Sequence, residues 1–89
     1  MTKHELKLKD RYFEAVVTEK KTFEIRNNDR DFHIGDILEF VRTDDKGKAI
    51  FNNVGTCDYC VCTVEYILTS QEFPDGLKDG YVILGIKRL

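Results

Sequence analysis

Short stretches of the chain are rich in residues that favour strands, and several of them alternate apolar and polar positions. A period of two is typical of a strand with one buried face, and β-branched and aromatic residues suit the pleated surface of a sheet. The stretches are residues 4–8, 21–26, 37–43, 59–68 and 81–86, with a shorter one at 49–51. The last long stretch is almost entirely apolar, so we expect both of its faces to be buried. The pattern therefore predicts five to six strands, with Leu6 and Leu8 of the first one facing inward.

One helix is expected early in the chain, between the first two strands. Its apolar residues recur at the spacing of a single helical stripe: Tyr12, Phe13, Val16 and Val17. Asp10 precedes this stripe and is a suitable N-cap for a helix over residues 11–19. Many short strands and one early helix favour a small closed or nearly closed β-barrel, with the helix covering one end.

Composition places the chain among globular domains. Its 89 residues support one domain, spanning residues 1–89, and the 42% hydrophobic and 34% charged content is typical of a folded protein. No apolar run approaches the roughly 18 residues that a membrane-spanning helix needs. The N-terminal residues MTKHELKLKD are charged and alternating, unlike a signal peptide. We therefore expect a cytoplasmic domain with no membrane partner.

The formal net charge of the chain is −2. Proteins that bind nucleic acids mainly by neutralising phosphates usually carry a strong basic excess. Any binding to RNA or DNA must therefore use a local patch, and a small neutral or anionic ligand suits this charge balance equally well.

Three cysteines lie close together, at Cys57, Cys60 and Cys62. An odd, clustered set argues against a disulfide scaffold, and no second C-x-x-C completes the four ligands of a structural zinc site. Cys60 and Cys62 share one face of a predicted strand, where thiols pack as small apolar side chains. We expect reduced core or loop cysteines, no metal and no cofactor, with metal binding and redox activity as the alternatives.

The predicted strand over residues 21–26 has two different faces. Phe23 and Ile25 share one face, which we expect to pack in the core, and Glu24 and Arg26 share the other. The second face carries a carboxylate beside a guanidinium, and it is the first candidate for a functional surface.

Lys21, Glu24 and Arg26 have side chains that suit a nucleotide. Arg26 offers a planar fork for a phosphate or a base edge, and Glu24 can accept a hydrogen bond from an exocyclic amine. Lys21 precedes the strand and is placed to contact phosphate. The alternative interpretation is an exposed ion pair of little energetic value.

Three further residues are candidate ligand contacts. Asn28 and Arg30 lie in the polar run 27–31, which is either the rim of a site or a solvated turn. Tyr81 begins the last strand and is placed to stack on a base, although aromatic residues in strands more often belong to the core. His33 is interpreted as a loop histidine, because no nucleophile accompanies it at a fixed spacing.

The segment around Lys21, Glu24 and Arg26 resembles the signature of ASCH domains, which belong to the PUA-like group. Their pattern runs Gly-x-Lys-x-x-Glu-x-Arg after the first helix, and Glu19 stands here at the glycine position. We therefore expect the helix to end without a left-handed residue. The resemblance extends over nearly the whole chain except residues 44–58, and it is greatest to a branch of very small, functionally uncharacterised ASCH domains.

The resemblance implies an α+β, mainly β fold, a small PUA-like β-barrel of five to six strands with one early helix. It also implies that the protein binds RNA or a nucleotide-like ligand. One ASCH branch is an amidohydrolase that removes the acetyl group from acetylated cytidine, using a Lys, a Thr and a distant Glu. Lys21 matches that Lys, whereas Glu24 stands at the position of the Thr.

An enzyme of this kind would use Lys21 and Glu24 as catalytic residues, but glutamate at position 24 favours binding over hydrolysis. A third alternative is an accessory domain whose edge strands pair with a protein partner.

Overall fold

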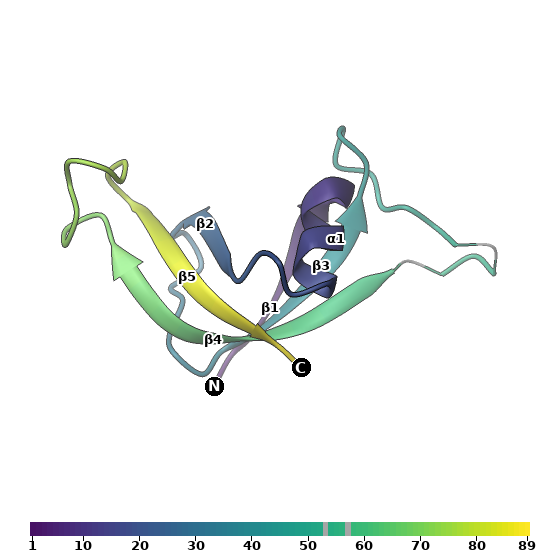
Figure 1. The fold of residues 1–89 in the computed structure, drawn as a ribbon, viewed down its shortest axis with the longest axis horizontal. Coiled ribbons are helices and arrows are strands. Elements are labelled where there is room, and N and C mark those ends of the chain that lie inside the picture. Colours follow the sequence, from purple (N-terminus) through teal and green to yellow (C-terminus); the bar gives the residue numbers. More distant parts are fainter. Residues whose placement is uncertain (53, 57) are drawn as a thin grey trace.

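Five strands and one helix form the fold of residues 1–52, 54–56 and 58–89, the part of the chain that the computed structural model describes (Figure 1). In chain order the elements are β1 (Lys3–Lys9), α1 (Asp10–Val17), β2 (Phe23–Asn27), β3 (Ile37–Thr43), β4 (Tyr59–Thr69) and β5 (Tyr81–Arg88). The predicted mainly β fold with one early helix is confirmed. Within these residues, no helix has the length and apolar character needed to cross a membrane.

The strands form one sheet in the order β1-β3-β4-β5-β2. β1 runs parallel to β3, and the other neighbouring strands are antiparallel. The register between β4 and β5 shifts between Val64 and Tyr66, and the sheet curls into an open half-barrel (Figure 1). The curl brings the edge strands β1 and β2 towards each other, so that the Arg26 side chain reaches the backbone of Lys7. We call the gap between β1 and β2 the seam.

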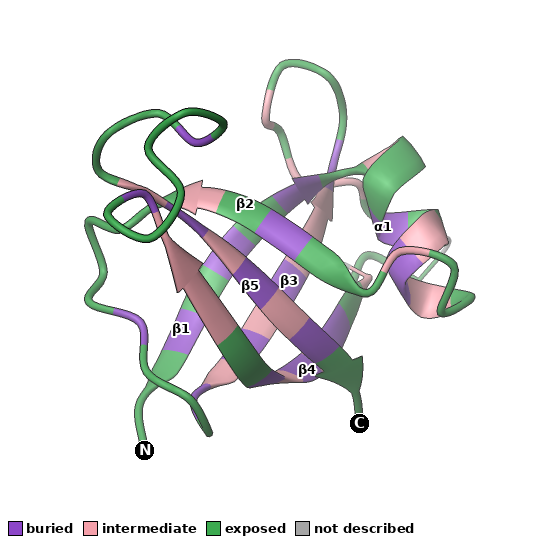
Figure 2. Ribbon diagram, turned by 60° about the vertical axis from the view of Figure 1, so that its left-hand side comes forward, coloured by how far each residue is buried: buried purple, intermediate pink, exposed green. Residues whose placement is uncertain are grey.

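The core lies on the concave face of the sheet. Buried and more exposed residues alternate along the strands, as expected when one face is covered (Figure 2). Leu6 and Leu8 face inward as predicted, and α1 adds Phe13 and Val16. The side chains with no exposed surface are Leu38, Phe40, Cys62, Val64 and Leu84.

Cys60 and Cys62 are buried in this core as free thiols, which confirms their predicted place. Cys57 lies outside the described residues. Among the residues that are described, no group of three or more His, Cys, Asp or Glu side chains is arranged to hold a metal ion.

The ends of α1 differ from the prediction. Asp10 is the first residue of the helix and Lys9 is the N-cap, because the Asp10 carboxylate instead pairs with Arg42 of β3 at 2.5 Å. The helix ends at Val17, and Glu19 has a φ of 60°. The expected helix end without a left-handed residue is therefore wrong, and Glu19 adopts the conformation that glycine usually provides.

The last strand has one buried face, so the prediction of two buried faces is wrong. Its inward residues are buried, whereas the outward ones, such as Ile83, are partly exposed. The reason is the position of the helix, since α1 packs beside β1 and β3. Of the predicted pairing of residues 49–51, the described residues show an isolated bridge between Thr43 and Ala49.

The faces of β2 are the reverse of those predicted. Phe23 and Ile25 are 46% and 53% exposed, whereas Glu24 is only 4% exposed. A buried carboxylate is tolerated where cations and hydrogen-bond donors surround it, and Lys21 and Arg26 supply both. The polar face of β2 therefore points inward, at the seam.

Candidate functional site

Glu24 is the centre of a charged cluster at the seam. Its Oε1 accepts a hydrogen bond from Nζ of Lys21, and its Oε2 accepts one from Nε of Arg26 at 2.9 Å. Glu24 and Arg26 lie two residues apart on one strand, so their side chains project on the same face. Lys21 lies just before the strand, and its Nζ also donates to the carbonyl oxygen of Phe23 at 2.7 Å. The predicted ion pair is thus a three-residue cluster in which two partly buried cations flank a buried carboxylate.

Arg26 links the cluster to the opposite side of the seam. While its Nε donates to Glu24, its Nη2 donates to the carbonyl oxygen of Lys7 in β1 at 2.7 Å. Two acceptors, one carboxylate oxygen of Glu24 and the carbonyl oxygen of Lys7, hold the guanidinium in place. The side chain therefore spans the seam, with cavities on both sides of it.

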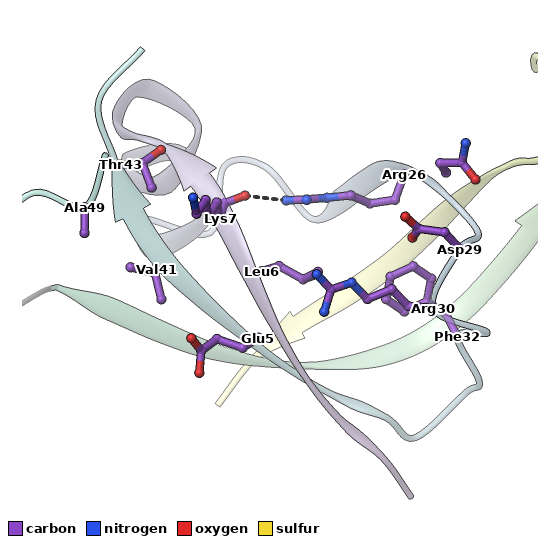
Figure 3. Close-up of a pocket in the computed structure, with 11 residues that line it drawn as sticks. Glu5, Leu6, Lys7, Arg26, Asp29, Arg30, Phe32, Val41, Thr43 and Ala49 are labelled. Atoms are coloured by element: carbon purple, nitrogen blue, oxygen red, sulfur yellow. Dashed lines mark hydrogen bonds between the residues drawn. The ribbon is translucent and has the colours of Figure 1, made fainter. Parts of the chain in front are cut away.

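The first cavity lies between β1, β3 and the loop after β2, and has a volume of about 680 Å³. Figure 3 shows Arg30 reaching across it beside Leu6, while Arg26 extends to Lys7. Its charged lining consists of Lys7, Arg26 and Arg30 against Glu5 and Asp29. The cavity therefore presents several hydrogen-bonding groups and a small positive excess.

The second cavity lies on the α1 side of Arg26 and has a volume of about 580 Å³. Its lining residues are Lys7, Leu8, Lys9, Tyr12, Lys21, Phe23, Glu24, Ile25 and Arg26. Nζ of Lys21 lies 5.0 Å from the centroid of the Phe23 ring and 5.8 Å from that of Tyr12. Four cationic side chains and two aromatic rings thus surround one carboxylate.

The six predicted ligand contacts fall into two groups. Lys21, Glu24 and Arg26 are in contact, and Arg30 lines the first cavity with Arg26. Asn28 and Tyr81 line a separate hollow of about 330 Å³ beside Ser70 and Gly80.

Asn28 has a structural contact in this separate hollow. Its Oδ1 accepts a hydrogen bond from the backbone N–H of Phe32 at 3.1 Å, which holds the loop after β2. Nζ of Lys78 lies 5.8 Å from the centroid of the Tyr81 ring. The hollow that holds Asn28 and Tyr81 is not part of the seam.

The sequence patterns do not single out the lysines of β1 or the aromatic residues that line the second cavity. Lys7 and Lys9 lie on the outward face of β1, and their alternation with Leu6 and Leu8 was the available signal. The apolar pattern predicts Tyr12 and Phe23 as core residues, but they are 40% and 46% exposed.

A buried hydrogen-bonded pair, His4 and Asp36, lies at the start of β1. Nε2 of His4 and Oδ2 of Asp36 are 2.8 Å apart, and Asp36 also accepts hydrogen bonds from the backbone N–H groups of Thr2 and His33. Burial acts to raise the pKa of Asp36, but these hydrogen bonds outweigh it and lower the pKa to about 2. The His4 ring packs against Phe32, so this pair fixes the start of β1.

The chain resembles a solved structure over its full length. The crystal structure of hypothetical protein PH0355 matches with a TM-score of 0.60 and 19% sequence identity, covering 100% of each chain. A likeness at this identity shows the fold alone. No curated protein matches the chain. A family model described as "Domain of unknown function (DUF3850)" matches residues 3–86, which is nearly the whole chain, and the protein therefore belongs to the DUF3850 family.

Proposed function

We propose that the protein is an RNA- or nucleotide-binding module of the ASCH type, with a PUA-like barrel, and that its ligand binds at the seam. The observation that carries this proposal is the lining of the seam, where cations and exposed aromatic rings surround one buried carboxylate. The Lys-x-x-Glu-x-Arg signature lies at the centre of this lining, which supports the resemblance to ASCH domains.

The charge of the seam supports an anionic ligand. Lys7, Lys9, Lys21 and Arg26 line the second cavity with Glu24, an excess of three positive charges on a chain whose net charge is −2. A local basic patch on an acidic protein attracts phosphate groups without strong non-specific binding. We therefore expect binding of a short segment or a small nucleotide rather than coating of long duplexes.

The aromatic rings of the second cavity support a ligand with flat bases. Phe23 and Tyr12 expose a large share of their surface beside Lys21. Stacking of a base on an exposed aromatic ring contributes about 1–3 kcal/mol to binding and tolerates any base. Cations and aromatic rings side by side are typical of surfaces that bind single strands.

The contacts of Lys21 favour binding over hydrolysis. Its Nζ donates to Glu24 and to the Phe23 carbonyl oxygen, so it is engaged with two acceptors. A catalytic lysine in the manner of the acetylcytidine amidohydrolases would need a free amine beside the substrate. Incubation with acetylated cytidine is the direct test of this alternative.

The gap between the edge strands bears on the third alternative, a protein partner. Arg26 already spans the gap and donates to the Lys7 carbonyl oxygen, an acceptor that an added strand would need. This contact supports a ligand that meets side chains.

The buried free thiols of Cys60 and Cys62 agree with a cytoplasmic location, where thiols stay reduced.

The proposal is tested by titrating fluorescently labelled single-stranded RNA at low salt. We expect Lys9→Ala and Arg26→Ala to weaken binding by about tenfold, the effect of one lost contact to a charged group. Lys46→Ala, at an exposed loop outside the seam, removes the same charge and serves as the control. Circular dichroism establishes that each variant folds, and equal affinity of all four proteins would remove the seam from consideration.

A further inference from the structure

The Arg26 side chain divides the seam into two compartments. Both cavities share Lys7 and Arg26 in their linings, and these are the only two residues common to both among the residues that line them. The Arg26 guanidinium is held from both sides, by Glu24 at 2.9 Å and by the Lys7 carbonyl oxygen at 2.7 Å. An anion placed between the compartments therefore meets a fixed guanidinium and the Lys7 ammonium.

The compartment on the α1 side is built for stacking. Tyr12 and Phe23 supply exposed rings, and Ile25 adds an apolar wall. Its other polar groups are the ammonium groups of Lys9 and Lys21 and the carboxylate of Glu24, which already has two cationic partners. A flat base can stack here, but few groups are available to identify it.

The compartment on the loop side is built for hydrogen bonding. Arg30 extends across it (Figure 3). Its lining also includes Asn27, Asp29 and Glu5, which contribute further donors and acceptors. Arginine pairs with two acceptors of guanine, and carboxylates accept from the amino groups of bases. No hydrogen bond or ion pair occupies the Arg30 side chain within the described part of the chain, so its guanidinium is available to a ligand.

We propose that the seam binds two adjacent nucleotides of a single strand, one in each compartment, with the linking phosphate against Arg26 and Lys7. One base stacks on Tyr12 and Phe23, and the edge of the other base meets Arg30. The volumes of about 580 and 680 Å³ each lie within the range of sites that bind small molecules. This inference rests on the proposed function and adds the length of the ligand and the role of each compartment.

The length of the ligand is tested by isothermal titration with four probes: adenosine monophosphate, guanosine monophosphate, the dinucleotide ApG and a tetranucleotide. We expect ApG to bind at least about tenfold more tightly than either mononucleotide, and the tetranucleotide to gain less than about threefold over ApG. ApG carries less charge than a mononucleotide, so a site that responds to charge alone would show the opposite order.

The role of each compartment is tested with two variants of exposed residues. We expect Phe23→Ala to weaken adenosine monophosphate and ApG alike, since both stack, and Arg30→Gln to weaken ApG while leaving adenosine monophosphate unchanged. Tyr66→Ala removes an exposed ring of β4, across Gly85 from Phe23, and Lys46→Gln removes an exposed charge. These two controls should bind every probe as the wild type does.

The outcomes separate this inference from the proposed function. Equal affinity for mononucleotides and ApG, or a steady gain with every added nucleotide, overturns the two-compartment site and leaves nucleotide binding intact. An Arg30→Gln variant that weakens adenosine monophosphate as much as ApG also overturns it. Failure of all four probes to bind overturns the proposed function and this inference with it.

Discussion

At the residue scale, two buried carboxylates organise the molecule in different ways. Glu24 is neutralised by two cations, Lys21 and Arg26, at the seam. Asp36 faces one histidine, His4, and accepts two backbone N–H groups as well. A buried charge is stable only with such partners, so each carboxylate fixes the residues around it. Glu24 thereby positions a ligand-facing arginine, and Asp36 holds the start of β1 against the turn before β3.

We expect the stabilising contribution of Asp36 to be lost in acid. Its folded-state pKa of about 2 lies below the ordinary value of 3.8, so its contribution to the free energy of unfolding is present above about pH 4 and is lost as the pH falls towards 2. Asp36→Asn removes this contribution. We expect the variant to be less stable by about 1–3 kcal/mol at pH 5, because buried donors lose an acceptor.

The measurement is urea unfolding of both proteins between pH 5 and pH 2. The difference in the free energy of unfolding between wild type and Asp36→Asn should become steadily smaller as the pH falls over this range. Asp45→Asn, in an exposed turn, should have the same free energy of unfolding as the wild type throughout. A difference in the free energy of unfolding that stays constant down to pH 2 would contradict the assigned role of Asp36.

At the element scale, β2 is the strand whose environment departs from its pattern. It lies at an edge of the sheet, pairs with β5, and turns Glu24 inward and Ile25 outward. We expect Ile25→Ala to change the free energy of unfolding by less than about 1 kcal/mol, as for a surface residue. Leu84→Ala, at the β5 position paired with Glu24, should cost about 2–5 kcal/mol because it leaves a cavity in the core.

Urea unfolding of the two variants compares the outward face of β2 with the buried face of the sheet. If Ile25→Ala lowered the free energy of unfolding as much as Leu84→Ala does, Ile25 would belong to the core and the assigned faces of β2 would be wrong.

The contrast between β2 and β3 explains how far the sequence predicts the fold. The bounds of β3, Ile37–Thr43, match the predicted strand because its apolar alternation and its burial agree. In β2 the rule that apolar residues face inward fails, since the partners of Glu24 include an arginine that is anchored on a different strand. That anchor depends on the curl of the whole sheet, which no local pattern encodes.

In the candidate site, too, some residues could be predicted from the local sequence, whereas others depend on how the sheet curls. Lys21, Glu24 and Arg26 were predicted together because they lie within six positions of one segment. Lys7 and Lys9 join them only because β1 and β2, which are not neighbours in the sheet, approach across the seam. Asn28 is near the cluster in sequence, but its backbone pairs with Gly80 and its side chain holds the loop. Nearness in sequence therefore identified the centre of the seam and not its walls.

At the scale of the whole molecule, the net charge of −2 and the basic seam oppose each other. An acidic surface repels a polyanion at long range, whereas the seam attracts a phosphate only at short range. Binding of a long strand should therefore be limited to the phosphates that reach the seam, and the number of these phosphates can be measured from the effect of salt.

For a single strand, each neutralised phosphate contributes about −0.7 to the slope of log K against log salt concentration. The proposed site holds one linking phosphate, against Arg26 and Lys7, so a 12-nucleotide RNA should give a slope of about −0.7. Arg26→Ala should reduce its magnitude towards zero, and Lys46→Ala should leave it unchanged. A slope steeper than about −3 would mean that phosphates are bound over a surface much larger than the seam. The same titration thus decides whether the seam alone, on an otherwise acidic domain, is sufficient to bind the strand.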